Sequence, residues 1–258
     1  MPINTLTNSL SSIEPFSKYD RWSMYFDGTN NNRVNCGSDS SLDVGTKDFT
    51  ISAWFKSVDG SGSKDNWPIV SKGHSLGSGD GWAVTHIDSS THSNKMFFDL
   101  VTSSGGGTRN IEQTGADIVN MNQWHHVVCV GDNTNNLMYI YIDGSLTNAA
   151  NTITVTDLTD DSDVFYIGND ANSRDYEGYI SDVAFYNDIA FTAGQVTTIY
   201  NGGTPYNHKE GIEPTKLKGW WRMGDGVENG TGSTIYDASG NGNNGTVENG
   251  PVFAEDSP

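Results

Sequence analysis

The sequence predicts an all-β fold, an antiparallel sandwich or barrel with one short helix. Glycine occurs 30 times among the 258 residues, and aromatic residues make up 11% of the chain. With abundant Asn, Ser, Thr and Asp, this composition suits short strands joined by tight turns better than long helices. Short apolar or alternating runs also recur at regular spacing, which is the pattern of such sheets.

The predicted strands begin near residue 22 and are separated by polar, turn-forming segments such as "DGTNNNR" and "GDNTNN". No linker is rich enough in Pro or Ser to divide the chain convincingly, although residues 202–216 are the best candidate. We therefore expect one domain over residues 21–258. Its strands are predicted at "WSMYF", "FTISAWFK", "PIVSKG", "GWAVTHI", "KMFFDLV", "WHHVVCV", "LMYIYI", "VFYIG", "GYISDVAFY" and "GWWRM".

One helix is predicted at residues 193–200. Thr192 can cap it, and Gln195, three residues on, completes a capping box. Gly202 can adopt the left-handed conformation that ends a helix. The apolar face of this helix would consist of Val196, Ile199 and Tyr200.

The chain is strongly acidic, with 32 Asp and Glu against 14 Lys and Arg and a formal charge of −18. This charge repels phosphate backbones and anionic lipid headgroups, and no basic stripe is present to dock them. Nucleic acid is therefore excluded as an expected partner. The same charge can attract divalent cations.

Residues 1–20 are predicted to form a polar N-terminal arm without periodicity. Such an arm either frays or becomes ordered against a neighbouring subunit, and the sequence leaves both open. It has neither the basic region nor the apolar core of a signal peptide, and no later run is long enough to span a bilayer. We therefore expect a protein made in the cytoplasm without secretion or membrane insertion.

The segment "QWHHVVCVGDNTNNLMYIYIDG", residues 123–144, places two histidines and a cysteine in one apolar run. It predicts a hairpin in which the side chains alternate between faces, so His125 and His126 point apart and cannot bind one metal together. We expect both rings to be structural, without a carboxylate partner inside the hairpin. With only two cysteines, we expect Cys36 and Cys129 to be separately buried thiols rather than a disulfide.

The hairpin, the preceding "FTISAWFK" and the following "VFYIGND" and "YEGYISDVAFYNDIAFTAGQVTTIYNGG" together resemble the laminin G-like jelly-roll domains of the concanavalin A-like lectin and glucanase superfamily. The resemblance covers about residues 22–203. It implies a jelly-roll β-sandwich. The C-terminal "WWRMGDG" and "DASGNGNNGT" resemble a family segment that usually comes first, which indicates that segment 217–253 closes the sandwich in permuted order. The alternative is the start of a second repeat.

Chains that end in this way resemble structural proteins of tailed bacteriophages, especially marine ones. The resemblance implies a non-enzymatic virion protein, a decoration, fibre or adhesion module, whose partners are other capsid or tail subunits and further copies of itself. The alternative is a lectin-like module that binds carbohydrate, including host-surface glycans. A glycoside hydrolase is disfavoured, because the Glu-x-Asp-x-x-Glu pattern of the glucanase branch is absent and the acidic residues Asp175, Glu177 and Asp182 have the wrong order. A solvated sheet edge is the expected place for those three.

Two sets of residues are candidates for binding. Trp67 and Trp82 stand next to turns and could stack on the C–H face of a sugar, whereas Trp54 and Trp124, inside apolar runs, are expected in the core. A structural calcium ion could be held by oxygen ligands in a Gly-rich turn, although successive turns without a metal explain the same residues. The candidate calcium ligands are Asp237, Asn241 and Asn243.

Overall fold

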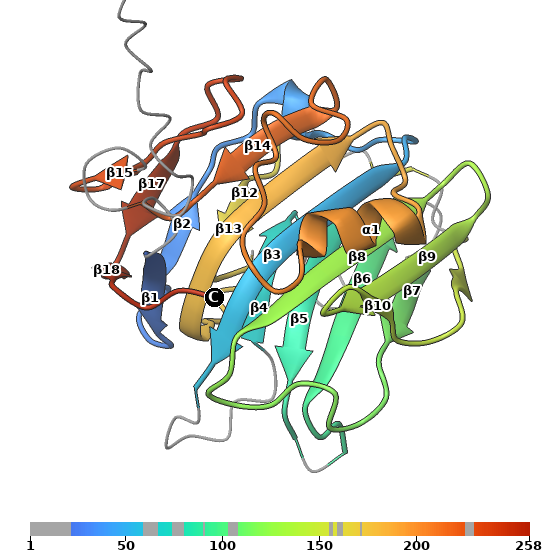
Figure 1. Ribbon diagram of the computed structural model, residues 1–258, viewed down its shortest axis with the longest axis horizontal. Helices are drawn as coiled ribbons and strands as arrows, with labels where there is room; N and C mark the ends of the chain where they lie inside the picture. Colours follow the sequence, from blue (N-terminus) through green and yellow to red (C-terminus); the bar gives the residue numbers. More distant parts are fainter. Residues whose placement is uncertain are drawn as a thin grey trace, which may run out of the picture.

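The computed structural model describes residues 22–58, 67–73, 80–89, 91–102, 108–154, 157–158, 162–170, 172–224 and 230–258. Two antiparallel sheets pack face to face, and one short helix lies on the outer face of the first sheet (Figure 1). This is the predicted all-β jelly-roll sandwich. The predicted arm, residues 1–20, lies outside the described residues.

The first sheet has the strand order β10-β9-β8-β3-β13-β1-β18, with β11 beside β9 and β14 beside β13. Its strands are β1 (Ser23–Asp27), β3 (Phe49–Ser57), β8 (His125–Asp132), β9 (Leu137–Ile142), β10 (Ser145–Leu146), β11 (Asn151–Thr152), β13 (Glu177–Asn187), β14 (Leu217–Trp221) and β18 (Val252–Ala254).

The second sheet has the strand order β15-β16-β17-β2-β12-β4-β5-β6-β7. A short 3-10 helix, Ser40–Leu42, follows its strand β2. The strands are β2 (Arg33–Asn35), β4 (Trp67–Lys72), β5 (Gly81–Ile87), β6 (Lys95–Thr102), β7 (Thr108–Gln113), β12 (Phe165–Ile167), β15 (Gly230–Thr231), β16 (Thr234–Ile235) and β17 (Gly245–Glu248).

Strand β8 is apolar on both faces because both faces are covered. Val127 and Cys129 belong to the core between the sheets, whereas Val128 and Val130 pack with the helix on the outer side. The strand therefore reads as a continuous apolar run rather than an alternating one. The predicted division of this hairpin into two faces is confirmed.

Helix α1 (Ala193–Tyr200) occupies the predicted residues and begins with the predicted capping box between Thr192 and Gln195. Val196 and Ile199 are fully buried against the first sheet. The left-handed turn that ends the helix starts at Asn201 (φ 52°) and continues through Gly202 (φ 66°). Asparagine tolerates this conformation better than most residues, so the stop begins one residue earlier than predicted.

The C-terminal segment closes the sandwich, as predicted. Strand β14 pairs with one half of β13, with Ala184 opposite Trp220, and β1 pairs with the other half, with Ile180 opposite Met24. The chain then enters the second sheet as β15, β16 and β17, of which β17 pairs with β2, and returns to the first sheet as β18, which pairs with β1. It thereby covers edges that would otherwise present unpaired backbone groups.

Cys36 and Cys129 are both buried and unbridged, as predicted. Burial raises the pKa of each thiol well above its ordinary value, with a further contribution from Asp237 for Cys36 and from Glu112 for Cys129. Both are therefore inert, protonated core side chains. Among the described residues, no helix combines the length and the apolar character that crossing a bilayer requires.

We expect Trp221→Ala to lower the free energy of unfolding by about 3–5 kcal/mol, because it removes a large core side chain and leaves a cavity. The Trp221 side chain is fully buried, its ring centroid lies 4.8 Å from that of Phe165, and its Nε1 donates to the Asn243 carbonyl at 2.7 Å. Urea unfolding followed by circular dichroism measures the loss. The matched control is Val252→Ala, which is 54% exposed on β18 and should change stability little. Equal losses of unfolding free energy in the two variants would contradict the conclusion that segment 217–253 is an integral part of the sandwich.

Candidate functional site

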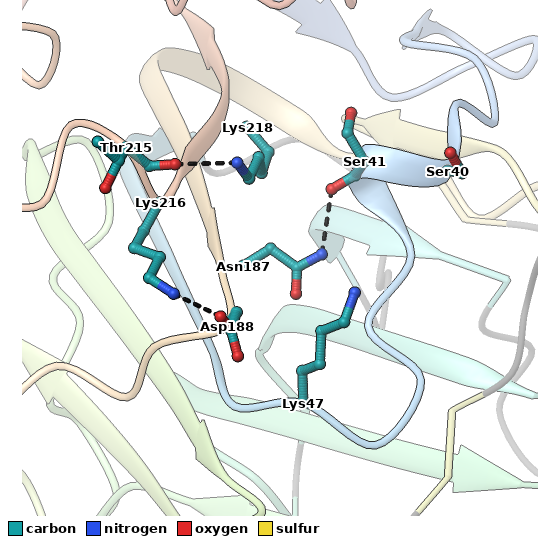
Figure 2. Close-up of a pocket in the computed structure, with 8 residues that line it drawn as sticks. All are labelled: Ser40, Ser41, Lys47, Asn187, Asp188, Thr215, Lys216 and Lys218. Atoms are coloured by element: carbon teal, nitrogen blue, oxygen red, sulfur yellow. Dashed lines mark hydrogen bonds and ion pairs between the residues drawn. The ribbon is translucent and has the colours of Figure 1, made fainter.

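An open pocket of about 500 Å³ lies at one end of the first sheet. Four segments meet there: the 3-10 helix after β2, the turn before β3, the end of β13 and the start of β14 (Figure 2). The lining side chains are polar or charged. They are Ser40, Ser41, Lys47, Asn187, Asp188, Thr215, Lys216 and Lys218.

Local hydrogen bonds fix the serine wall of this pocket. The Asp39 carboxylate accepts the Ser41 backbone N–H at 2.9 Å and so caps the 3-10 helix. This hydrogen bond is the main cause of a lowered pKa for Asp39. The Ser41 hydroxyl is held from the other side, where it accepts from Asn243 Nδ2 at 3.0 Å.

Asn187 is the floor of the pocket. It is the last residue of β13 and only 3% exposed. Its Nδ2 donates to the carbonyl oxygens of Ser41 and Asp43 at 3.1 and 2.7 Å. Its Oδ1 is buried and has no hydrogen-bond partner in the described part of the chain. Because an unpaired buried carbonyl costs about 1–3 kcal/mol, this oxygen is expected to accept a hydrogen bond from a water molecule or a ligand.

Lys47 reaches the pocket from the turn before β3, and Lys216 and Lys218 reach it from the start of β14 (Figure 2). Lys216 forms an ion pair with Asp188, and Lys218 Nζ donates to the Thr215 carbonyl at 2.9 Å. Within the described residues, no ion pair engages the Lys47 ammonium, whose side chain extends toward the Asn187 side of the pocket. The Lys47 ammonium is thus available to a ligand.

The side chains that line the pocket carry a net positive charge. Three lysines face one aspartate there, although the whole chain carries a formal charge of −18. The pKa of Asp188 is lowered, first by its hydrogen bond to Lys216 and the charge of that lysine, then by the charges of Lys47 and Lys218. The arrangement fits a small ligand that carries hydroxyl groups and a negative charge. The single carboxylate of the lining gives no basis for paired-carboxylate hydrolysis.

Residues 18–197 match the family described as the concanavalin A-like lectin/glucanases superfamily. The chain belongs to this superfamily. No curated protein sequence matches it.

Solved structures share the fold at low sequence identity. A candidate carbohydrate-binding protein from Bacteroides ovatus ATCC 8483 has a TM-score of 0.62 and 21% identity over 91% of this chain, which spans 60% of that protein. The heptameric SAP-like pentraxin of Limulus polyphemus has a TM-score of 0.59 and 15% identity, with 91% of this chain and 95% of the pentraxin covered. Tailspike protein 2 of the Escherichia coli O157:H7 bacteriophage CAB120 has a TM-score of 0.52 and 13% identity, with 78% and 30% covered.

The structure corrects the prediction that Trp67 and Trp82 stack on a sugar. Trp67 lies in β4 and is 4% exposed, and Trp82 lies in β5 and is fully buried. The Trp82 ring packs with its centroid 5.9 Å from those of Phe49 and Phe185. Both indoles belong to the core of the sandwich, because strand alternation turns them inward.

Asp237, Asn241 and Asn243 form a hydrogen-bonded turn against β14. The Asp237 carboxylate accepts backbone N–H groups of Trp220, Ser239 and Asn243 at 2.9–3.0 Å. The side-chain amide of Asn241 donates to the Leu217 carbonyl at 2.9 Å, and that of Asn243 donates to the Lys218 carbonyl at 2.8 Å.

The hydrogen bonds of this turn bear on the predicted calcium site. The carboxylate faces amide hydrogens, whereas a hard cation needs oxygen atoms free to surround it. Among the described residues, no three His, Cys, Asp or Glu side chains gather into a metal-holding group. Calcium binding there stays a prediction that this hydrogen bonding disfavours. The three residues instead hold the start of β14, and with it the lysine side of the pocket.

His125 and His126 lie on opposite faces of β8, as predicted. His126 Nε2 is hydrogen-bonded to Ser52 Oγ at 2.8 Å. His125 Nδ1 lies 2.8 Å from the Asp143 carboxylate, and its Nε2 accepts the Asn120 backbone N–H at 3.0 Å. The prediction that neither histidine has a carboxylate partner within the hairpin is therefore wrong for His125, because Asp143 directly follows β9 and folds back to it. Both nitrogens of the His125 ring are thus hydrogen-bonded, whereas the buried Nδ1 of His126 has no partner in the described part of the chain.

Of the acidic residues Asp175, Glu177 and Asp182, the last is buried. Asp182 is 3% exposed and accepts Trp220 Nε1 at 2.6 Å, so the prediction of a solvated edge is wrong for this residue. Burial raises its pKa, but the nearby His208 ring, the hydrogen bond from Trp220 and the charge of Arg222 lower the pKa overall. Asp182 anchors β14 and the segment before it.

Stability should fall as the pH drops from 7 to 5. Burial lowers the pKa values of His86 and His126 to about 3, below the value of about 6.5 in an unfolded chain. Below pH 6.5 the unfolded state therefore binds more protons, and each histidine costs roughly 1.4 kcal/mol per pH unit. Asp99 acts in the opposite direction, since burial raises its pKa to about 6. As the pH falls below about 6, the folded state takes up a proton on Asp99 before the unfolded state does, and this increases the free energy of unfolding.

From pH 7 to pH 5 we expect a net loss of about 3 kcal/mol from these three groups. Urea unfolding at the two pH values measures it. In His126→Gln the loss should shrink to about 1 kcal/mol, because one of the two histidine contributions is gone. A pH dependence that is the same in the variant and the parent protein would contradict this assignment.

Proposed function

We propose that this protein is a non-catalytic carbohydrate-binding module that holds a glycan bearing a negative charge in the lysine-lined pocket. The observation that carries the proposal is the buried Asn187 Oδ1 without a partner in the described part of the chain, beside the available Lys47 ammonium. The amide oxygen can accept a hydrogen bond from a sugar hydroxyl, and the ammonium can pair with a carboxylate or sulfate group.

Two further facts support a binding module. The superfamily to which the chain belongs includes lectins by its description, and the Bacteroides ovatus protein that shares the fold over 91% of this chain is a candidate carbohydrate-binding protein. The pocket is open and polar, as a site for a hydrated saccharide should be, rather than an enclosed apolar cavity.

Lys47→Gln should weaken binding of an acidic oligosaccharide at least about tenfold, because a charge-assisted hydrogen bond is lost. Isothermal titration calorimetry at low and high salt measures the affinity, and in the parent protein it should decrease with salt. The matched control is Lys209→Gln, an exposed lysine outside the pocket whose replacement changes the net charge equally. Identical affinities for the two variants would overturn the proposal.

We propose in addition that the module acts on the particle of a tailed bacteriophage, as a decoration, fibre or adhesion subunit in several copies. The support is the phage-like C-terminal sequence "WWRMGDG" with "DASGNGNNGT" and the shared fold with a phage tailspike protein. Its partners would be other virion subunits and further copies of this chain, with host-surface glycans as the ligand, and it would be made in the host cytoplasm.

Deleting residues 1–18 should leave the melting temperature of the folded domain nearly unchanged and abolish incorporation into particles or oligomers. A polar arm of this length buries little apolar area by itself and gains order only from a neighbour. Thermal melting and size-exclusion chromatography with light scattering measure the two effects. Normal assembly of the deleted form would show that the arm does not contact a neighbour.

A further inference from the structure

A second polar and aromatic surface lies on the outer face of the first sheet, away from the pocket. It consists of Tyr25 on β1, Tyr179 on β13, Lys56 on β3 and Trp124 just before β8, and we call these four residues the aromatic platform. All four are half-buried. Their neighbours along the strands, such as Phe26, Ile180 and Phe55, point into the core, so alternation places the platform side chains outward.

The platform is assembled around the Lys56 ammonium. This cation lies 4.3 Å from the centre of the Tyr179 ring and 5.6 Å from that of the Trp124 ring, which is cation–π geometry. The Tyr25 and Tyr179 ring centroids are 4.9 Å apart. The sequence predicts Trp124 in the core, so it gives no sign of the platform.

A carboxylate of the chain itself occupies this platform. Asp256 forms an ion pair with Lys56 and accepts Trp124 Nε1 at 2.9 Å. It belongs to residues 255–258, which follow β18 and cross the outer face of the sheet (Figure 1). The strand order requires this crossing. In the order β3-β13-β1-β18, the segment leaves β18 at the edge and must pass β1 and β13 to reach Lys56 on β3. We call residues 255–258 the strap.

We propose that the aromatic platform is a second saccharide-binding site, selective for a sugar acid, and that Asp256 holds the position of the sugar carboxylate until a ligand displaces the strap. The ammonium and the indole N–H supply two donors that together fix one carboxylate. The neighbouring tyrosine rings offer faces on which the C–H side of a pyranose can stack. The site is distinct from the lysine-lined pocket, so it does not depend on the function proposed there.

The strap makes a specific prediction, because an internal occupant competes with an external ligand. The apparent dissociation constant equals the intrinsic value divided by the fraction of molecules in which the platform is open. Removing the Asp256 carboxylate opens the platform and should strengthen binding. Removing the Lys56 charge destroys the site itself and should weaken it. A merely structural ion pair predicts no binding in any of these forms.

The test is a titration of full-length protein with a glucuronate-containing disaccharide, with its neutral glucose counterpart as the reference. The readout is the NMR signal of the Trp124 indole N–H, assigned through Trp124→Phe. We expect Asp256→Ala to bind the acidic disaccharide about tenfold more tightly than the parent protein. Asp256→Ala combined with Lys56→Gln should bind at least about tenfold more weakly than Asp256→Ala alone.

Two control variants distinguish binding at the platform from a general charge effect and from binding in the pocket. Glu255→Ala removes a charge from the same strap at an exposed side chain and should leave the affinity at the parental value. Lys47→Gln, in the pocket, should leave the Trp124 response unchanged, so failure of one site is distinguishable from failure of the other. The proposal is overturned if Asp256→Ala shows no gain over the parent protein, or if an acidic peptide shifts the Trp124 signal while the sugar acid does not.

Discussion

One irregularity in strand β13 determines which side chains of this strand face the core and which face outward. Between Ser181 and Ala184, β13 advances three residues while its partner β3 advances two, so β13 carries one extra residue. Asp182 sits in this bulge with φ 49°. An extra residue reverses the alternation of every side chain that follows. Ile180 and Val183 therefore both face the core, although three positions separate them.

The pocket depends on this reversal. Asn187 follows Val183 and Phe185 by an even number of residues, so it lies on the same inner face of β13. Its amide there donates to the carbonyl oxygens of Ser41 and Asp43 at the 3-10 helix. Without the bulge this position would point outward. The buried Asp182 carboxylate, which accepts the Trp220 indole N–H, holds β14 at the same place, and β14 leads back to the lysines of the pocket. The bulge thus positions both walls.

The sequence allowed prediction of the features that depend on neighbours along the chain. Helix α1 follows from the Thr192 cap, and the two faces of β8 follow from alternation. The pocket could not be predicted, because Lys47, Asn187 and Lys218 are far apart in sequence and share no motif. Two predictions about tryptophans are wrong: Trp67 and Trp82 lie in the core, and Trp124 is half-buried on the outer face of the first sheet. Position next to a turn does not decide the face of a strand, and the register that decides it is set by partners elsewhere in the chain.

Some charged residues of this chain hold turns, and others belong to the two proposed binding sites. Asp39 and Asp237 use their carboxylates to hold backbone N–H groups in turns, so part of the acidic excess is a consequence of a turn-rich fold. The cations of the two proposed sites lie at the two ends of β13: Lys47 near Asn187, and Lys56 against Tyr179. At about 3.3 Å per residue these ends are roughly 25 Å apart, so a single sugar residue cannot reach both. A polysaccharide is long enough to span this distance, and under the two proposals binding at one site would raise the effective concentration of the chain at the other.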